Sequence, residues 1–408
     1  MQTQPALGFA LALTLLGGLA PAHAAEPIRI AHITSMSGAF TAYGEQLQRG
    51  LEMGLQYATG GRMQVAGRPI ALTLKDDQMD PNRGRALVEE AYAEDGVDLV
   101  VGPMSSGVAV AVMPLAEEYG RVIMPEGVAD SITGKDWNRH VVRVGQSSSI
   151  YATANAIAST GPGTCVATIA QDYVFGRDSV AVYRQGAQAR GAQVVHEEYL
   201  PFDTTDFTAA AQRLFDALGQ AGECPGGKLI FSMWAGSSNP IGRINDLHPE
   251  RLGIRLAAPG DMMPILTTYA PFDGMEGATY YYYELPDNPV NDDFVRDHQR
   301  LYGTPPDYFT AQGFSQGMAI VAALEKSAGS SDAEDLIAAF EGLTFDSPKG
   351  PQTIRPADHQ AQQVMYHFRL QPQERSDWFA GRTVQAGVPQ LLGVIPVEQL
   401  TLPPQNGD

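Results

Sequence analysis

From residue 27 onward, short runs of β-branched and other apolar residues alternate with segments in which apolar residues recur at the helical period. The first predicted strands read PIRIAHI, RPIALTL, VDLVVGPM and RVIMPE. Predicted helices lie between them at about 41–58, 82–94 and 107–119, and the Asp80-Pro81 pair is a helix-start signal for the second. This alternation is typical of a parallel sheet with helices on both faces.

The pattern then begins again with TCVATIA, QVVHEEYL, KLIFSMW and IRLAAPG, separated by predicted helices near 174–190, 206–219 and 239–248. This second set has the same build, although no sequence repeat relates the two. The remainder contains a tyrosine run at 280–283, an aromatic-rich helical region at about 290–328, a short helix near 332–341 and extended segments punctuated by Gly and Pro.

Elements that follow two complete α/β units must pack back onto both of them. We therefore predict an α/β protein of two Rossmann-like lobes joined by a three-segment hinge, with crossings near residues 145, 275 and 348. The first lobe is expected over 25–146 plus about 276–347, and the second over 147–275 plus about 348–408.

The first 24 residues have the pattern of a cleavable signal peptide. An apolar run from Ala6 to Leu19 precedes the small-residue site Ala22-His23-Ala24, although residues 2–8 contain no Lys or Arg. No later stretch is long and apolar enough to span a membrane. We therefore expect an exported, freely diffusing periplasmic protein.

The chain has 408 residues with 46 acidic and 27 basic side chains, which gives a formal net charge of -19. A charge of this sign and size repels nucleic acid phosphates and anionic lipid surfaces. It therefore excludes these partners without constraining the chemistry of a local pocket.

Cys165 and Cys224 are the two cysteines of the chain. Each begins or precedes a strand of the second set, and these strands become neighbours if the first strand of that set lies between its second and third. A disulfide then fits an oxidising compartment, and its loop would contribute about 4 kcal/mol in the chain-entropy model. Two buried free thiols are the alternative.

In open α/β sheets, ligands bind beyond the carboxyl ends of the strands. Ser105 and Ser106 follow one such strand and precede a helix, so their hydroxyls and the exposed N–H groups can hold a carboxylate; an ordinary helix cap is the alternative. Aromatic side chains in the corresponding loops can pack on an apolar or planar ligand, although aromatic residues more often belong to a core; they are Tyr43, Tyr173, Phe175 and Trp234.

Glu126 and Asp261 each follow a buried strand, where an acidic side chain is costly unless it is paired or solvated. One interpretation is a salt bridge or a helix cap. The other is recognition of an ammonium group on the ligand, because a carboxylate beside aromatic faces suits a cation.

The sequence contains no motif of an enzyme or a metal site. It has no G-x-S-x-G elbow, no P-loop, no H-E-x-x-H and no His and Cys cluster at metal-ligand spacing. We therefore expect neither catalysis nor a cofactor.

Six segments follow one another in a characteristic order and spacing: IRIAHITSMSGAFTAYGEQLQRGLEMGL, KDDQMDP, VDLVVGPMSSGVAVAVMPLAEEYG, AQDYVFGRDSV, FTAQGFSQGMAIVAAL and FDSPKG. Together they resemble the type I periplasmic substrate-binding proteins of ABC transporters, in the branched-chain amino acid (leucine/isoleucine/valine) binding family. The resemblance covers essentially the whole mature chain.

The resemblance also implies roles for individual residues. Ser106 with Ser105, followed by Gly127 and Val128, would hold the ligand carboxylate, and Tyr43 would lie near the ligand side chain. Phe175 stands where the family has a tyrosine of the second-lobe Y-G turn, and Asp261 would meet the ammonium group.

Two departures from the family pattern matter. Amino acid binders generally have a threonine where Val128 aligns and a small residue where Glu126 stands. Both departures count against a strictly aliphatic amino acid ligand.

The resulting hypothesis is a monomeric, non-catalytic receptor. It binds a small organic solute (amino acid-like, an aromatic or other organic acid, or an amide) between two lobes and delivers it to the permease and ATPase subunits of an ABC transporter. A sensory module that reports the solute to a receptor or regulator is the alternative, and a secreted enzyme is a weaker one.

Overall fold

The computed structural model describes residues 1, 25–235, 239–401, 403, 404 and 406. The predicted signal peptide lies, except for Met1, outside the described residues. No helix in the described part of the chain is long and apolar enough to cross a membrane.

The first lobe is built on a five-stranded sheet with the order β2-β3-β1-β4-β5. All neighbours are parallel except the short β2, which pairs antiparallel with β3. The strands are β1 (Ile28–Thr34), β2 (Gln64–Val65), β3 (Arg68–Asp76), β4 (Leu99–Val101) and β5 (Val122–Met124). The helices are α1 (Thr41–Ala58), α2 (Pro81–Ala93), α3 (Ser106–Glu118), α10 (Tyr308–Lys326) and α11 (Ala333–Phe340).

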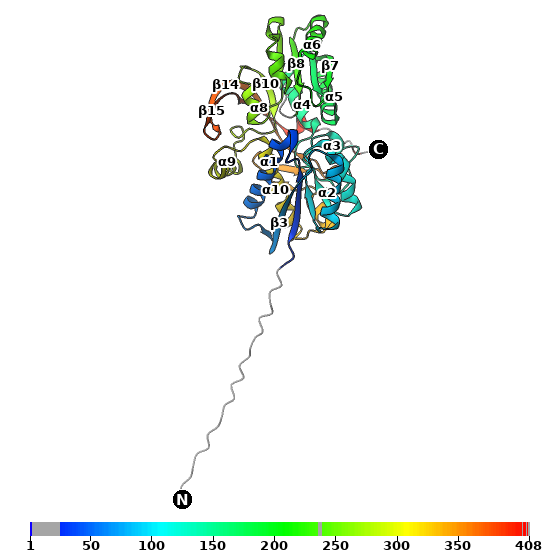
Figure 1. The fold of residues 1–408 in the computed structure, drawn as a ribbon, viewed down its shortest axis with the longest axis vertical. Helices are drawn as coiled ribbons and strands as arrows, with labels where there is room; N and C mark the ends of the chain where they lie inside the picture. Colours follow the sequence, from blue (N-terminus) through cyan, green and yellow to red (C-terminus); the bar gives the residue numbers. More distant parts are fainter. Residues whose placement is uncertain (2–24, 236–238, 402, 405, 407–408) are drawn as a thin grey trace.

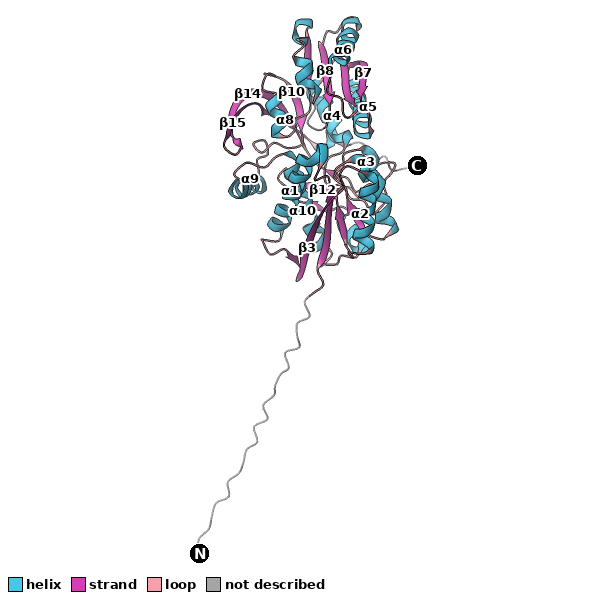
Figure 2. Ribbon diagram, viewed as in Figure 1, coloured by secondary structure: helices cyan, strands magenta, loops and turns pink. Residues whose placement is uncertain are grey.

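The second lobe is built on a four-stranded parallel sheet with the order β7-β6-β8-β9. Its strands are β6 (Cys165–Gln171), β7 (Gln193–Leu200), β8 (Lys228–Met233) and β9 (Ile254–Ala257). Its helices are α4 (Ser148–Ser159), α5 (Val174–Ala189), α6 (Thr208–Gln220), α7 (Pro240–Asn245) and α8 (Met263–Thr268). Figure 1 shows β3, α2 and α10 in one lobe and β7, β8, α5 and α6 in the other, and Figure 2 shows the helices flanking the sheets.

The later part of the chain adds two antiparallel sheets. One consists of β10 (Glu276–Thr279), β14 (Met365–Phe379) and β15 (Arg382–Ile395), and α4 packs against β10 and β14. The other consists of β11 (Thr344–Phe345), β12 (Gln352–Ile354) and β13 (Ala361–Gln362), and its Ile354 and Ala361 join the core of the first lobe. The lobe boundaries near 276 and 348 remain predictions.

The aromatic-rich helical region expected at about 290–328 consists of two helices, α9 (Pro289–Tyr302) and α10. The break falls at Gly303, which has a left-handed φ of 73° and ends α9, and Pro305 and Pro306 follow it. A glycine in this conformation followed by prolines cannot continue a helix. The short α12 (Val397–Leu400) is the last helix in the described part of the chain.

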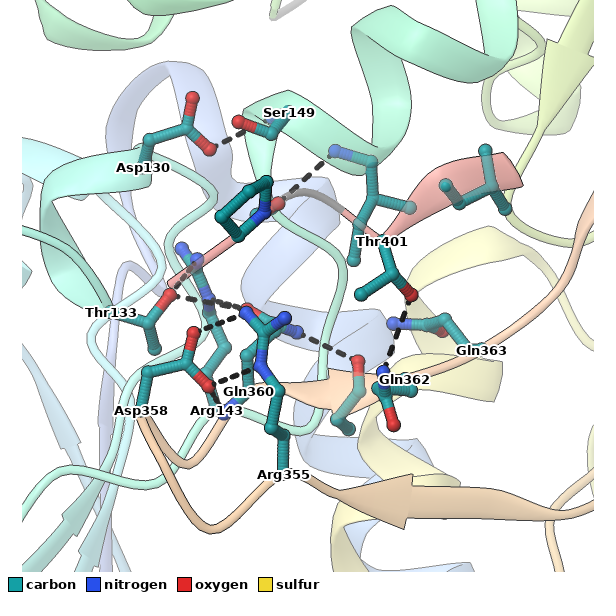
Figure 3. Close-up of a pocket in the computed structure, with 15 residues that line it drawn as sticks. Asp130, Thr133, Arg143, Ser149, Arg355, Asp358, Gln360, Gln362, Gln363 and Thr401 are labelled. Atoms are coloured by element: carbon teal, nitrogen blue, oxygen red, sulfur yellow. Dashed lines mark hydrogen bonds and ion pairs between the residues drawn. The ribbon is translucent and has the colours of Figure 1, made fainter. Parts of the chain in front are cut away.

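Arg143, close to the first predicted crossing, lies beside the distant segment 359–361. The Arg143 N–H donates to the His359 carbonyl at 3.0 Å, and the Ala361 N–H donates to the Arg143 carbonyl at 2.8 Å. The buried Arg143 guanidinium donates to the Ala129 carbonyl, to Thr133 and to Gln360. Figure 3 shows Thr133, Arg143 and Gln360 among the residues that line a pocket at this place. The backbone and the buried guanidinium of Arg143 thereby hold the two segments together.

The predicted disulfide is confirmed. Cys165 begins β6, Cys224 precedes β8, and the two sulfur atoms are bonded, with Cα atoms 5.6 Å apart. β6 lies between β7 and β8, which is the strand order that the pairing required.

Candidate ligand-binding cavity

A cavity between the lobes is lined by residues of both. Seven of the ten predicted ligand-binding residues line it: Tyr43, Ser106, Val128, Tyr173, Phe175, Trp234 and Asp261. The remaining three, Ser105, Glu126 and Gly127, are not among its lining residues. The sequence analysis did not single out the other lining residues, which are Phe40, Met104, Gln146, Tyr151, Ala235, Tyr308 and Phe309.

Ser106 is the first residue of α3. Its hydroxyl oxygen accepts hydrogen bonds from the N–H groups of Val128 and Ala129, each at 3.2 Å, so its proton remains available for a ligand acceptor. The preceding Ser105 is the N-cap residue, and its side chain makes no capping hydrogen bond. This wall of the cavity therefore presents a hydroxyl donor at a helix N-terminus, where an anion is favoured.

Aromatic rings form much of the remaining wall. Tyr43 is stacked between Phe40, with ring centroids 5.1 Å apart, and Phe309, with centroids 4.3 Å apart. From the second lobe, Tyr173 and Phe175 lie with centroids 5.9 Å apart. Such faces bury apolar or planar groups well.

Asp261 places a carboxylate in this apolar setting. Its Oδ1 accepts a hydrogen bond from the Met262 N–H at 2.7 Å, and the residues that line the cavity include no Lys or Arg. Burial, with a further contribution from the nearby Asp307 carboxylate, raises the pKa of Asp261 to about 7. The ionised form of this side chain therefore lacks a cationic partner.

Two phenols complete the polar lining. The Tyr151 hydroxyl donates to the Gly260 carbonyl at 2.8 Å, and the Gln146 side-chain amide donates to the Tyr308 hydroxyl. Burial raises the pKa of both tyrosines well above the usual value, so both phenols are neutral at physiological pH. They can position polar ligand atoms without adding charge.

Glu126 lies behind the cavity wall. Its carboxylate is within 2.9 Å of His32 Nε2 and accepts a hydrogen bond from the Thr34 hydroxyl at 2.9 Å. Its side chain is fully buried. Gly127 packs directly against Ser106, because a Cβ atom at Gly127 would lie 3.0 Å from the Ser106 Cα. Both residues thus support the segment that holds Ser106.

No group of three or more His, Cys, Asp or Glu residues in the described ranges could hold a metal ion.

Two α/β lobes around an aromatic cavity with a few polar groups define the class of two-lobed solute-binding proteins. The chain belongs to the periplasmic binding protein family, whose model matches residues 27–376. The resemblance seen in the sequence, and the predicted fold class, are thereby confirmed.

Individual relatives agree with this assignment. Leu/Ile/Val-binding protein homolog 6 of Brucella suis is 25% identical over 87% of this chain and 90% of its own length. The crystal structure of an ABC-type branched-chain amino acid transporter protein from Rhodopseudomonas palustris CGA009 is 44% identical, with a TM-score of 0.82, and the match covers 93% of this chain and 100% of that one. A solute-binding protein from R. palustris in complex with 4-hydroxybenzoate shares the fold at 21% identity, with a TM-score of 0.76 over 91% of this chain and 97% of that one.

The protein is therefore an extracytoplasmic solute-binding protein of an ABC transporter, which captures a small organic solute and delivers it to a membrane permease. It is not an enzyme, because its family consists of binding proteins.

Proposed function

We propose that this protein is a periplasmic receptor that binds, as a monomer, an amino acid with a bulky apolar or aromatic side chain. The carboxylate of the bound amino acid contacts Ser106 and the N-terminus of α3, and the ammonium group of the amino acid contacts Asp261. The observation that carries the proposal is that Ser106 and Asp261 line one cavity from opposite lobes.

The charges in the cavity favour a zwitterion. The lining residues include one carboxylate, Asp261, and no Lys or Arg. A ligand with a carboxylate alone would leave both its own charge and that of Asp261 without a cationic partner, which is costly in an apolar setting. An ammonium group on the ligand pairs with the charge of Asp261 and removes that part of the cost. The N-terminus of α3 stabilises the ligand carboxylate and reduces the rest.

The aromatic lining supports a large side chain. Phe175 and Trp234 line the cavity with apolar rings, and Val128 stands where the family pattern has a threonine. Relatives whose names describe branched-chain amino acid binding support the amino acid class.

An aromatic carboxylic acid is the second candidate. The burial of Asp261 favours it, because burial raises the pKa of this carboxyl to about 7 and a neutral Asp261 could donate a hydrogen bond to a bound acid. Distant relatives with the same fold bind 4-hydroxybenzoate and 3,4-dihydroxybenzoic acid.

A thermal-shift and calorimetric screen separates the candidates. The panel is L-leucine, L-phenylalanine, L-tyrosine, 4-hydroxybenzoate, benzamide and choline, because a bound ligand raises the melting temperature. We expect a zwitterion to bind tightest, with affinity falling below about pH 7 as Asp261 is protonated. Tighter binding of 4-hydroxybenzoate, strengthening as pH falls, would select the aromatic acid instead.

Two variants test the contacts. Ser106→Ala and Asp261→Asn should each weaken binding of the best ligand by about tenfold or more, as expected for hydrogen bonds to charged groups. Ser105→Ala is the neighbouring comparison and should leave affinity unchanged. Full affinity in both test variants would remove these residues from the site.

Export is tested separately. N-terminal sequencing of the protein from a periplasmic extract should begin at Ala25, and light scattering of the purified protein should give a monomer mass. A chain that starts at Met1, or a stable dimer, would contradict these parts of the proposal.

A further inference from the structure

A second acidic residue, Asp307, connects elements of the two lobes beside the ligand cavity. Its carboxylate accepts a hydrogen bond from the Met263 N–H at 3.1 Å to each oxygen. It also accepts from the Gln46 side-chain amide at 3.0 Å and from the Tyr308 N–H at 2.8 Å. One carboxylate thus gathers donors from three different helices.

These donors belong to different lobes. Gln46 is in α1, and Tyr308 begins α10, which packs along α1 in the first lobe. Met263 begins α8, which follows the last strand of the second-lobe sheet and packs against β15. The bond from Met263 to Asp307 therefore crosses from one lobe to the other.

Gln46 strengthens the same junction. Its amide nitrogen also lies 3.3 Å from the sulfur atom of Met262, and its carbonyl oxygen accepts from the Phe309 N–H at 3.1 Å. Because Gln46 is fixed by α10 on one side, its amide is held toward the 262–263 segment. The junction thus involves two first-lobe side chains and two consecutive second-lobe residues.

The segment held in this way carries Asp261. The Asp261 carboxylate accepts from the Met262 N–H, and Met262 is followed directly by the residue that Asp307 binds. Any movement of Met263 away from Asp307 therefore also moves the Asp261 side chain relative to the first-lobe wall of the cavity.

We propose that Asp307 is an interlobe latch, a positioning residue that holds the 261–263 segment against the first lobe when the lobes close. The latch forms only when α8 approaches α10, so it favours the closed arrangement and orients Asp261 toward the ligand. Its effect on ligand affinity rests on the proposed function, whereas its existence does not.

The capping of α10 is the competing role for this side chain, since Asp307 is also the N-cap residue of that helix. The two roles differ in the length of side chain that they require at position 307. A serine caps a helix well but has a shorter side chain, so Asp307→Ser should keep the bond to Tyr308 and lose the bond to Met263. Asp307→Ala should lose both.

Hydrogen exchange of the ligand-free, full-length protein provides the first test. In Asp307→Ser, exchange of the peptide that spans 261–266 should accelerate about tenfold, while the first turns of α10 keep their wild-type protection. Asp332→Ser is the matched control, because Asp332 caps α11 and its side chain accepts from the Glu334 N–H within the same helix. That control should leave the 261–266 peptide unchanged.

A kinetic measurement provides the second test. With L-phenylalanine and L-leucine as probes, Asp307→Ser should increase the dissociation rate about tenfold and change the association rate less. Unchanged exchange at 261–266 in Asp307→Ser, or acceleration only in Asp307→Ala together with α10, would overturn the latch and leave a helix cap. If neither probe binds the wild-type protein, the proposed ligand class fails, and the exchange measurement alone decides the latch.

Discussion

His32 Nε2 and Glu126 Oε1 lie 2.9 Å apart, and neither side chain is exposed to solvent. His32 belongs to β1, and Glu126 follows β5, so the contact ties a central strand to the segment that carries Val128. His32 Nδ1 in turn lies within hydrogen-bonding distance of the Gln48 side chain in α1. This buried network fixes the 126–129 segment, whose N–H groups hold the Ser106 hydroxyl.

Replacing Glu126 should therefore affect stability before it affects binding. Glu126→Gln removes the charge opposite His32 and should lower the free energy of unfolding by about 3 kcal/mol, as expected for breaking a buried pair. Urea denaturation measures this loss. Glu117→Gln, at an exposed position of α3, is the control and should change stability by less than about 0.5 kcal/mol. An unchanged stability with a tens-fold loss of ligand affinity would instead make Glu126 a ligand contact.

The same pair should give a defined pH dependence. Burial lowers the pKa of His32, but the Glu126 carboxylate and its hydrogen bond outweigh burial, so the pKa lies above its usual value of 6.5. A raised pKa in the folded state means that the pair contributes its full stability below pH 6.5 and loses it as pH rises through the raised pKa. Melting temperatures should therefore decline above pH 6.5 in the wild type and decline less in Glu126→Gln. Parallel profiles for the two proteins would contradict a charged His32.

The two acidic residues at the lobe junction, Asp261 and Asp307, should change the stability of the protein at a lower pH than the His32–Glu126 pair does. Burial is the main cause of the raised pKa values of Asp261, to about 7, and of Asp307, to about 6. Because the folded protein keeps these protons where the unfolded chain has lost them, stability of the ligand-free protein should fall as pH rises from about 4 to 7. Asp261→Asn should flatten this part of the melting profile. A bound amine should do the same, since its charge allows Asp261 to ionise.

The sequence supports the fold well because its main signals are local and periodic. Apolar strands alternating with helices predict both sheets, and the strand order needed by Cys165 and Cys224 is the one found. The cavity is partly predictable because loops at the carboxyl ends of strands converge in such sheets. Tyr43, Ser106 and Trp234 lie in such loops or in the helical turns that follow them.

The rest of the site depends on contacts between distant parts of the chain. Tyr151 lies in a helix after the first hinge crossing, and Tyr308 begins a helix that returns from the later part of the chain, so neither follows a strand of the two main sheets. The sequence marks Glu126 as unusual because it directly follows a buried strand. No local pattern indicates that its partner is His32, 94 residues earlier. The periodicity of the sequence predicts which face of a helix or strand is buried. It does not predict which residues from distant parts of the chain will be in contact.

The disulfide should make a large contribution to stability. It closes a loop with a sequence separation of 59 residues, which corresponds to about 4 kcal/mol in the chain-entropy model. The double variant Cys165→Ala with Cys224→Ala should lose stability of this order in urea denaturation and keep its ligand affinity at low temperature. Thiol titration of the denatured, unreduced periplasmic protein should find no free thiol, and two thiols would contradict the bridge.

The close contact between α1 and α10 leads to the last prediction. A Cβ atom at Gly54 would lie 2.2 Å from the Phe314 carbonyl oxygen, and one at Gly313 would lie 2.2 Å from the Leu47 carbonyl oxygen. Because backbone atoms cannot move aside as a flexible side chain can, the two helices must separate to accept any larger residue. Since α10 also carries Asp307, separation would disturb the lobe junction as well as the core.

Gly54→Ala should therefore destabilise the protein by about 3 kcal/mol, at the upper end of the cost of overpacking, although alanine is the better helix former. Gly219→Ala is the matched control. Gly219 lies in α6, and a Cβ atom there would meet nothing within 4 Å, so the substitution should raise stability by up to about 1 kcal/mol. Urea denaturation should show a lower free energy of unfolding for Gly54→Ala and a higher one for Gly219→Ala. Equal effects at the two positions would mean that α1 and α10 do not pack backbone to backbone.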